Sequence, residues 1–191
     1  MKGMKVVAVL GSPRQDSNSQ KLAEAAISAL PPEGLEVKKA RLSAMDYKGC
    51  QACFACKGAS EICVLKDDLT KVLADVAEAD MVILASPIYI GEITGQMKCF
   101  IDRTFSYYLP DYTTNPKPSR LAPGKKMLFI LTQGMPDAAV YEGPVLGHYT
   151  GYFQSLGFDV RHFIAPGLGG DDIEKTNPDK LKAVAEMAAG M

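Results

Sequence analysis

The sequence has no tryptophan, only two histidines and no long hydrophobic run. Its apolar stretches reach about six to eight residues, well below the roughly 20 residues that a membrane-spanning helix needs. Neither histidine lies in an H-E-x-x-H spacing and no G-x-S-x-G motif is present, which argues against a zinc protease or a serine hydrolase. We therefore expect no membrane partner and no catalytic triad.

An excess of charge of either sign is also missing. The chain carries 21 Lys and Arg against 22 Asp and Glu, giving a net charge of −1, so we expect no nucleic-acid partner. The apolar run near the N-terminus is short and lacks a small-residue cleavage site, which predicts a cytoplasmic protein. With 191 residues, 47% hydrophobic and 23% charged, the chain fits one globular domain over residues 1–191.

Short apolar runs alternate with helical patterns along the chain. The runs predict five strands at 6–10, 35–42, 81–85, 126–132 and 158–164, the third ended by Ser86 and Pro87. The helical patterns cover 18–30, a segment that begins after Asp67 and Asp68, 93–108, a stretch up to about 156, and a segment from about 178. This alternation predicts an α/β fold with a parallel sheet and helices on both faces.

In such sheets ligands bind beyond the carboxyl ends of the strands, so the loop after the first strand is a candidate site. This loop is rich in hydroxyl groups and stands at a helix N-terminus. Only Gly11 is present, so it is neither a Walker A loop nor a G-x-G-x-x-G motif. Its donors suit a terminal phosphate, although a plain helix cap also explains them. The candidate phosphate ligands are Ser12, Arg14, Asn18 and Ser19.

The loops after the third and fourth strands offer a different chemistry. The first presents apolar and aromatic groups on which a flat ring can stack, or which cover the sheet end or a subunit interface. The second offers a hydroxyl, an amide and a bare backbone for the polar edge of such a ring. The residues concerned are Ile88, Tyr89 and Ile90, which follow Pro87, and then Thr132, Gln133 and Gly134. Together the three loops describe a site with a phosphate at one end and a flat ring at the other.

As a set, these motifs resemble the flavodoxin-fold NADPH-dependent FMN reductase superfamily. The matching pieces are Gly11-Ser12-Pro13-Arg14 with Asn18-Ser19, Asp67-Asp68, Ser86-Pro87-Ile88-Tyr89 with Gly91, and Lys98 with Ile101-Asp102-Arg103. Ser17 departs from the family, which often has glycine there.

The resemblance implies a three-layer sandwich with a five-stranded parallel sheet ordered 2-1-3-4-5, and a homodimer or tetramer. It also implies that FMN is bound, with its phosphate on Ser12, Arg14, Asn18 and Ser19. Pro87, Ile88, Tyr89 and Gly91 would then face the isoalloxazine ring, and residues 132–134 would close the third side.

The cysteines form a separate signal in a loop over residues 49–64. Cys50, Cys53, Cys56 and Cys63 read C-x2-C-x2-C-x6-C, the spacing with which bacterial ferredoxins begin. In a reducing compartment disulfides are rare, which leaves a [4Fe–4S] cluster, structural zinc or redox-active thiols. The arrangement is similar to the compact motif of iron–sulfur flavoproteins, a branch of the same superfamily. Cys99 stands apart and is predicted to be a buried core residue.

The expected function is an FMN-dependent oxidoreductase that moves electrons between a [4Fe–4S] cluster and FMN, with a small redox protein such as ferredoxin as donor. One alternative is a cluster-free NAD(P)H-dependent FMN or quinone reductase. Another is a non-catalytic FMN-binding protein with structural zinc. We expect no catalytic side chain, because the chemistry belongs to the cofactors. A long Pro- and Tyr-rich loop at 109–125 is long enough to reach a neighbouring subunit, and Tyr108 or Tyr112 is expected at that interface.

Overall fold

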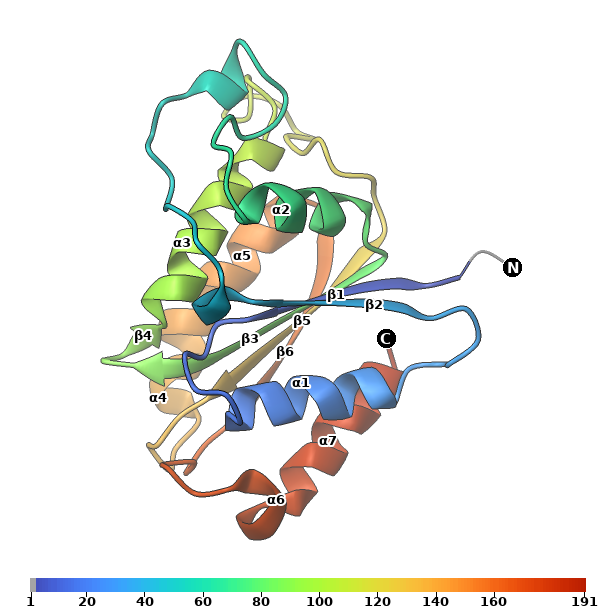
Figure 1. The fold of residues 1–191 in the computed structure, drawn as a ribbon, viewed down its shortest axis with the longest axis vertical. Coiled ribbons are helices and arrows are strands. Elements are labelled where there is room, and N and C mark those ends of the chain that lie inside the picture. The colour runs from blue at the N-terminus through green and yellow to red at the C-terminus, as the bar shows by residue number, and fades with distance from the viewer. Residues whose placement is uncertain (1–2) are drawn as a thin grey trace.

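A parallel sheet lies at the centre of the fold (Figure 1). The computed structural model describes residues 3–191 and orders the strands β2-β1-β3-β5-β6, which confirms the α/β class and the predicted order. The parallel strands are β1 (Lys5–Leu10), β2 (Glu36–Arg41), β3 (Met81–Tyr89), β5 (Lys125–Thr132) and β6 (Phe158–Ala165). A short strand that the sequence did not predict, β4 (Glu92–Ile93), pairs antiparallel with the end of β3.

Helices cover both faces of the sheet, because successive side chains of a buried strand point to opposite sides. One core holds Val7 and Val9 of β1, and the other holds Val6, Ala8 and Leu10. The first face packs against α2 (Leu69–Glu78), α3 (Gly95–Arg103) and α5 (His148–Ser155), and the second against α1 (Asn18–Ser28) and α7 (Pro178–Ala189). Within residues 3–191, no helix combines the length and the apolar character needed to cross a membrane.

The third strand is longer than predicted. Ser86 and Pro87 do not end it, and β3 continues to Tyr89. Pairing with β1 stops at Ala85, whereas pairing with β5 continues through Pro87, which lies opposite Thr132. A proline is tolerated at such a point, because a ladder hydrogen bond is no longer required on both sides of the strand.

Two predicted helices are broken into shorter pieces. The segment predicted at 93–108 is helical only as α3, and a 3-10 turn over Thr104–Tyr107 follows it. The stretch up to 156 divides into α4 (Ala139–Tyr141), a π-helical turn over Glu142–Gly147, and α5. Pro144 lies in that turn and has no N–H to donate, which accounts for the interruption. One more short helix, α6 (Ile173–Thr176), precedes α7.

The start of α3 is fastened to the end of β1. Thr94 caps the helix by accepting a hydrogen bond from Met97 N at 3.2 Å, and its hydroxyl donates to Gly11 O at 2.7 Å. The backbones approach so closely that a Cβ atom on Gly11 would lie 2.9 Å from Met97 Cβ and 3.0 Å from Thr94 Oγ1. Glycine is therefore required at the point where the first loop leaves the sheet.

This contact predicts the outcome of two matched substitutions. Gly11→Ala should lower the free energy of unfolding by about 1–3 kcal/mol, because the added methyl overfills a packed site. Gly95→Ala is the control, since a Cβ atom there meets no atom within 4 Å. Thermal unfolding should show a lower midpoint for the first variant and an unchanged or raised one for the second. Equal midpoints would contradict the steric argument.

Candidate functional site

A cavity of about 210 Å³ opens at the carboxyl ends of β1, β3 and β5. Ten of the eleven residues predicted to bind FMN line it, all except Gly91: Ser12, Arg14, Asn18, Ser19, Pro87, Ile88, Tyr89, Thr132, Gln133 and Gly134. The three loops predicted from the sequence therefore do meet at one place. Ser17, Leu168 and Gly169 also line the cavity, and the sequence did not predict them.

One end of the cavity is a cradle of buried hydroxyl groups at the N-terminus of α1. Ser12, Ser17 and Ser19 are all at most 5% exposed. Ser17 caps the helix by accepting from Gln20 N at 3.2 Å, and its Oγ lies 3.2 Å from that of Ser19. Hydroxyl donors beside the positive end of a helix dipole favour an anion. Arg14 is exposed at the rim and adds a cation to this end.

Asn18 has a structural task that the sequence did not reveal. Its amide nitrogen donates to Asp171 O at 2.8 Å, and its amide oxygen accepts from Ile173 N at 3.1 Å. One helical turn later, Lys21 forms an ion pair with Asp172 at 2.6 Å. These contacts hold the segment after β6, which supplies Leu168 and Gly169 to the cavity wall. Both ends of the Asn18 amide are thus engaged with the chain's own backbone.

The other end of the cavity contains a buried acceptor that lacks a donor. Gln133 is 2% exposed, and its amide nitrogen donates to Met135 O at 3.1 Å and Asp137 O at 2.7 Å. Among the described residues its Oε1 has no hydrogen-bond partner. An unsatisfied buried acceptor costs about 1–3 kcal/mol, so this end is suited to a ligand that brings an N–H group.

The hairpin at the mouth of the cavity is strained. Tyr89 pairs with Glu92, and the two residues between them have positive φ, 51° at Ile90 and 79° at Gly91. This is the type I′ pattern, for which glycine is well suited and isoleucine is not. Ile90 is fully exposed and Tyr89 is 44% exposed. Gly91 therefore serves the turn and lies outside the cavity wall.

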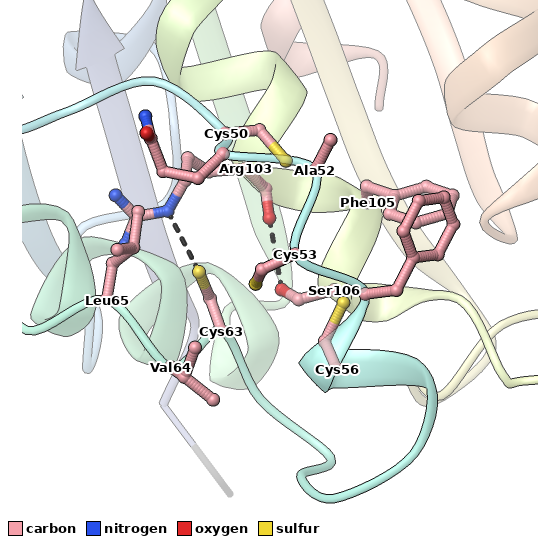
Figure 2. Close-up of a pocket in the computed structure, with 12 residues that line it drawn as sticks. Cys50, Ala52, Cys53, Cys56, Cys63, Val64, Leu65, Arg103, Phe105 and Ser106 are labelled. Atoms are coloured by element: carbon pink, nitrogen blue, oxygen red, sulfur yellow. Dashed lines mark hydrogen bonds between the residues drawn. The ribbon is translucent and has the colours of Figure 1, made fainter.

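The four predicted metal ligands line a second, smaller cavity of about 110 Å³ (Figure 2). Cys50 and Cys53 are exposed, Cys56 and Cys63 are half-buried, and all four are free thiols. The loop turns sharply because Ala52 and Phe54, with φ of 49° and 55°, take left-handed conformations between the cysteines. Such backbone strain is uncommon outside sites where geometry is functional.

Cys99 departs from its prediction. It is half-buried, not buried, and its thiol faces the start of the cysteine loop. A Cβ atom on Gly49 would lie 3.3 Å from Cys99 Sγ. Cys99 contributes nothing to the wall of the cavity that the other four cysteines line.

A buried arginine contacts one of the four thiols. The Arg103 side chain is 0% exposed and donates from Nε to Cys63 Sγ at 3.0 Å. Its two terminal nitrogens donate to the carboxylate of Asp67 at 2.7 and 3.2 Å, and Nη1 also donates to Lys48 O at 2.8 Å. Burial alone would lower the pKa of Arg103, but the bond to Asp67 and the field of Cys63 raise it. The pKa of Asp67 is lowered despite its burial, mainly by the bond from Arg103.

A lysine contacts a second thiol of the cysteine loop, that of Cys56. Lys57 Nζ donates to Phe105 O at 2.7 Å and Tyr108 O at 2.9 Å, and lies 3.5 Å from Cys56 Sγ. It also stands 4.2 Å from the centre of the Phe105 ring. Burial lowers the pKa of Lys57, and Cys56 opposes this effect. Two cations thus approach the cysteine cavity from two different segments.

The long loop at 109–125 folds back onto its own chain. Arg120 donates to Tyr108 O at 3.1 Å and to Cys56 O at 3.3 Å, which ties this loop to the cysteine loop. The Tyr108 ring is 9% exposed and lies 5.4 Å from the half-buried ring of Tyr112. The two tyrosines predicted at a subunit interface therefore already pack together inside one protomer.

The two cavities stand at opposite ends of one helix. The first lies by the β3–β4 hairpin, where α3 begins, and the cysteine loop lies at the far end of α3 (Figure 1). Helix α3 has nine residues and is therefore about 13 Å long, at roughly 1.5 Å per residue. A rigid element thus joins the two candidate sites.

Comparison with known families supports this description. A family model described as NADPH-dependent FMN reductase matches residues 4–141. An iron-sulfur flavoprotein of Archaeoglobus fulgidus is 43% identical over 104 residues, covering 54% of this chain and 47% of that protein. An iron-sulfur flavoprotein of Methanocaldococcus jannaschii is 36% identical over 101 residues, which cover 53% of this chain and 52% of that protein. The chain spans about half the length of the curated relatives it matches.

Solved structures share the fold at low sequence identity. An NAD(P)H:quinone oxidoreductase from Methanothermobacter marburgensis superposes with a TM-score of 0.75 at 15% identity, over 98% of this chain and 96% of that one. An FMN-dependent NADH-azoreductase from Bacillus anthracis, in complex with FMN, superposes with a TM-score of 0.71 at 17% identity, over 97% of this chain and 98% of that one. At these identities the likeness establishes the fold alone.

The strain at Ile90 yields a prediction about stability. Ile90→Gly should raise the free energy of unfolding by about 1 kcal/mol, because glycine adopts positive φ without a steric penalty. Ile62→Gly is the control, since Ile62 is also exposed but is not among the positive-φ residues. The control should gain nothing. If urea denaturation shows the same change for both variants, the turn is not strained.

Proposed function

Because the chain belongs to the NADPH-dependent FMN reductase family, we propose that it is an FMN-dependent oxidoreductase in which an iron–sulfur cluster exchanges electrons with FMN. One observation carries the proposal: four cysteines line one cavity, and a buried arginine and a half-buried lysine contact two of their thiols. The curated relatives named iron-sulfur flavoproteins support it, although the chain covers only about half of their length.

The first cavity fits FMN chemically at both ends. Its cradle of serine hydroxyls at the start of α1 would hold the phosphate, with Arg14 supplying a charge at the rim. The free acceptor of Gln133 would receive a ring N–H, and Ile88 and Tyr89 would contact the ring itself. When bound, FMN accepts either one or two electrons, so the side chains need only bind and orient it.

The cysteine cavity fits a cluster better than a single zinc ion. Zinc needs four ligands around one point, with sulfurs within about 4 Å of each other, since Zn–S is about 2.3 Å. Among residues 3–191, no three His, Cys, Asp or Glu side chains are arranged to hold a single metal ion. In a [4Fe–4S] cluster each cysteine binds a different iron, so the thiols stand around a larger volume. The arrangement of the thiols therefore does not favour structural zinc.

A cluster-free NAD(P)H-dependent reductase is the second candidate. The exposed Tyr89 and the open mouth of the first cavity favour it, because a nicotinamide needs access to one face of the ring. The structural neighbours named as a quinone oxidoreductase and an azoreductase are in keeping with this reading. In the leading proposal the donor is instead a small redox protein such as ferredoxin, which would approach the exposed Cys50 and Cys53.

Assembly is part of the proposal. We propose a homodimer or tetramer, because the mouth of the first cavity presents the exposed side chains of Tyr89 and Ile90. A second copy would cover these groups and shield the ring from water. Light scattering at micromolar concentration should show more than one chain per particle.

One experiment separates the two candidate functions. The protein is purified without oxygen, supplied with iron and sulfide, and analysed for bound iron. Absorbance, with low-temperature electron paramagnetic resonance after reduction, then identifies the chromophores. Cluster absorbance and a paramagnetic signal beside FMN support the leading proposal. Flavin bands alone, with no stable iron, overturn it in favour of the cluster-free reductase.

The phosphate end yields a binding prediction. Arg14→Ala should weaken FMN binding by about 1.5–3 kcal/mol, the scale of a charge-assisted hydrogen bond. Riboflavin, which lacks the phosphate, is the control ligand and should bind both proteins alike. Fluorescence titration measures both affinities. Equal losses for the two ligands would show that Arg14 does not recognise the phosphate.

The cysteine cavity yields a second prediction. Replacing any one of Cys50, Cys53, Cys56 or Cys63 by Ala should remove or destabilise the iron and leave FMN bound, because the flavin cavity uses other loops. Cys99→Ala is the matched control and should retain both cofactors. Iron and flavin are quantified in each variant after anaerobic reconstitution. Iron loss in the control alone would refute the ligand assignment.

A further inference from the structure

All three nitrogens of one buried guanidinium donate hydrogen bonds to the cysteine loop or to the residues that flank it. Arg103 comes from the end of α3 and reaches the loop at three points: the Lys48 carbonyl before the first cysteine, the Cys63 thiol, and the Asp67 carboxylate after the last cysteine. Its side chain is 0% exposed. It therefore holds the two ends of the cysteine loop together from inside the protein.

Asp67 determines which nitrogen faces the thiol. The carboxylate takes both terminal nitrogens of the guanidinium, one on each oxygen, at 2.7 and 3.2 Å. Because the guanidinium is planar and rigid, this two-point contact directs Nε at Cys63 Sγ, 3.0 Å away. A neutral thiol is a weak acceptor, whereas a thiolate accepts strongly from a cation.

The four cysteines consequently fall into two pairs. Cys56 and Cys63 are half-buried and each faces a cation, Lys57 or Arg103. Cys50 and Cys53 are exposed, and no hydrogen bond from a side chain to their sulfurs is recorded among residues 3–191. Lys57 is itself fixed by the Phe105 and Tyr108 carbonyls, so its position does not depend on a metal.

We infer that Arg103 and Lys57 are positioning residues that set the reduction potential of the proposed cluster through Cys63 and Cys56. This inference rests on the proposed function. A cluster held by thiolates becomes more negative when it is reduced, so a buried cation bonded to a ligand sulfur stabilises the reduced state. Arg103 and Lys57 therefore make the reduction potential of the proposed cluster less negative. They do so from the side of the half-buried ligands, Cys56 and Cys63.

The test uses variants that leave no charge buried alone. In the double variant Arg103→Gln with Asp67→Asn, both members of the ion pair become amides and the net charge is unchanged. Any change then reports the lost contact with Cys63 and not the total charge. Lys57→Met tests the second cation independently, in case the double variant fails to fold. Arg103→Lys keeps the charge but cannot reproduce the two-point contact.

The control is Lys66→Gln, which removes an exposed positive charge three residues after Cys63. Each protein is reconstituted without oxygen, its iron is counted, and the midpoint potential is measured by a redox titration followed by electron paramagnetic resonance. We expect the double variant and Lys57→Met to have more negative potentials than the wild type. The potential of Arg103→Lys should lie between those of the double variant and the wild type. The potential of Lys66→Gln should equal that of the wild type.

The possible failures are distinguishable. If the wild-type protein takes up no iron, the proposed function is wrong and this inference falls with it. If the wild type holds a cluster and both Lys57→Met and the double variant keep its potential, the cations are merely structural and the inference is wrong, while the proposed function stands. Where the double variant does not fold, Lys57→Met alone decides. A shift of equal size in Lys66→Gln would also overturn it, because general charge and not contact would be responsible.

Discussion

The buried ion pair between Arg103 and Asp67 is the contact on which the arrangement of the cysteine loop depends. Taking a guanidinium out of water costs several kcal/mol, and the cost is recovered only if its donors find well-placed acceptors. Asp67, the Lys48 carbonyl and Cys63 are those acceptors. The loop between Lys48 and Asp67 is thereby closed at its base, although it contains little regular structure. Lys57 and Arg120 then fix the middle of the loop near Cys56.

A second contact fixes the other end of α3, where the helix begins. Thr94 is bonded to Gly11, so the helix is fixed to the strand end that opens the first cavity. The flavin cavity and the cysteine cavity are therefore positioned by opposite ends of a single element. This explains how a short chain can keep two separate sites in a constant geometry.

Local patterns sufficed to predict much of the fold and the place of both cavities. Strand runs, helix starts and the cysteine spacing are encoded within a few residues of each other, and the loops at 11–19, 86–91 and 132–134 converge as expected. The rest depends on contacts between distant segments. The long β3 follows from where β1 stops pairing, and the task of Asn18 follows from a segment about 150 residues away. Nothing in the chemistry of Leu168 and Gly169 indicates that they line a binding cavity. Lys57 is different, because its place next to Cys56 could have predicted a cation beside that thiol.

The attachment of the last third of the chain to α1 has a consequence for how the protein matures. The family match ends at residue 141, yet one wall of the flavin cavity comes from Leu168 and Gly169, held by Asn18 and Lys21. During synthesis the serine cradle leaves the ribosome early, but its cavity is not enclosed until β6 has been added to the sheet and α6 has docked. The wall of the cavity is therefore complete only when nearly the whole chain is in place. A chain interrupted after β5 would carry the recognisable motifs of the family and still lack a closed pocket.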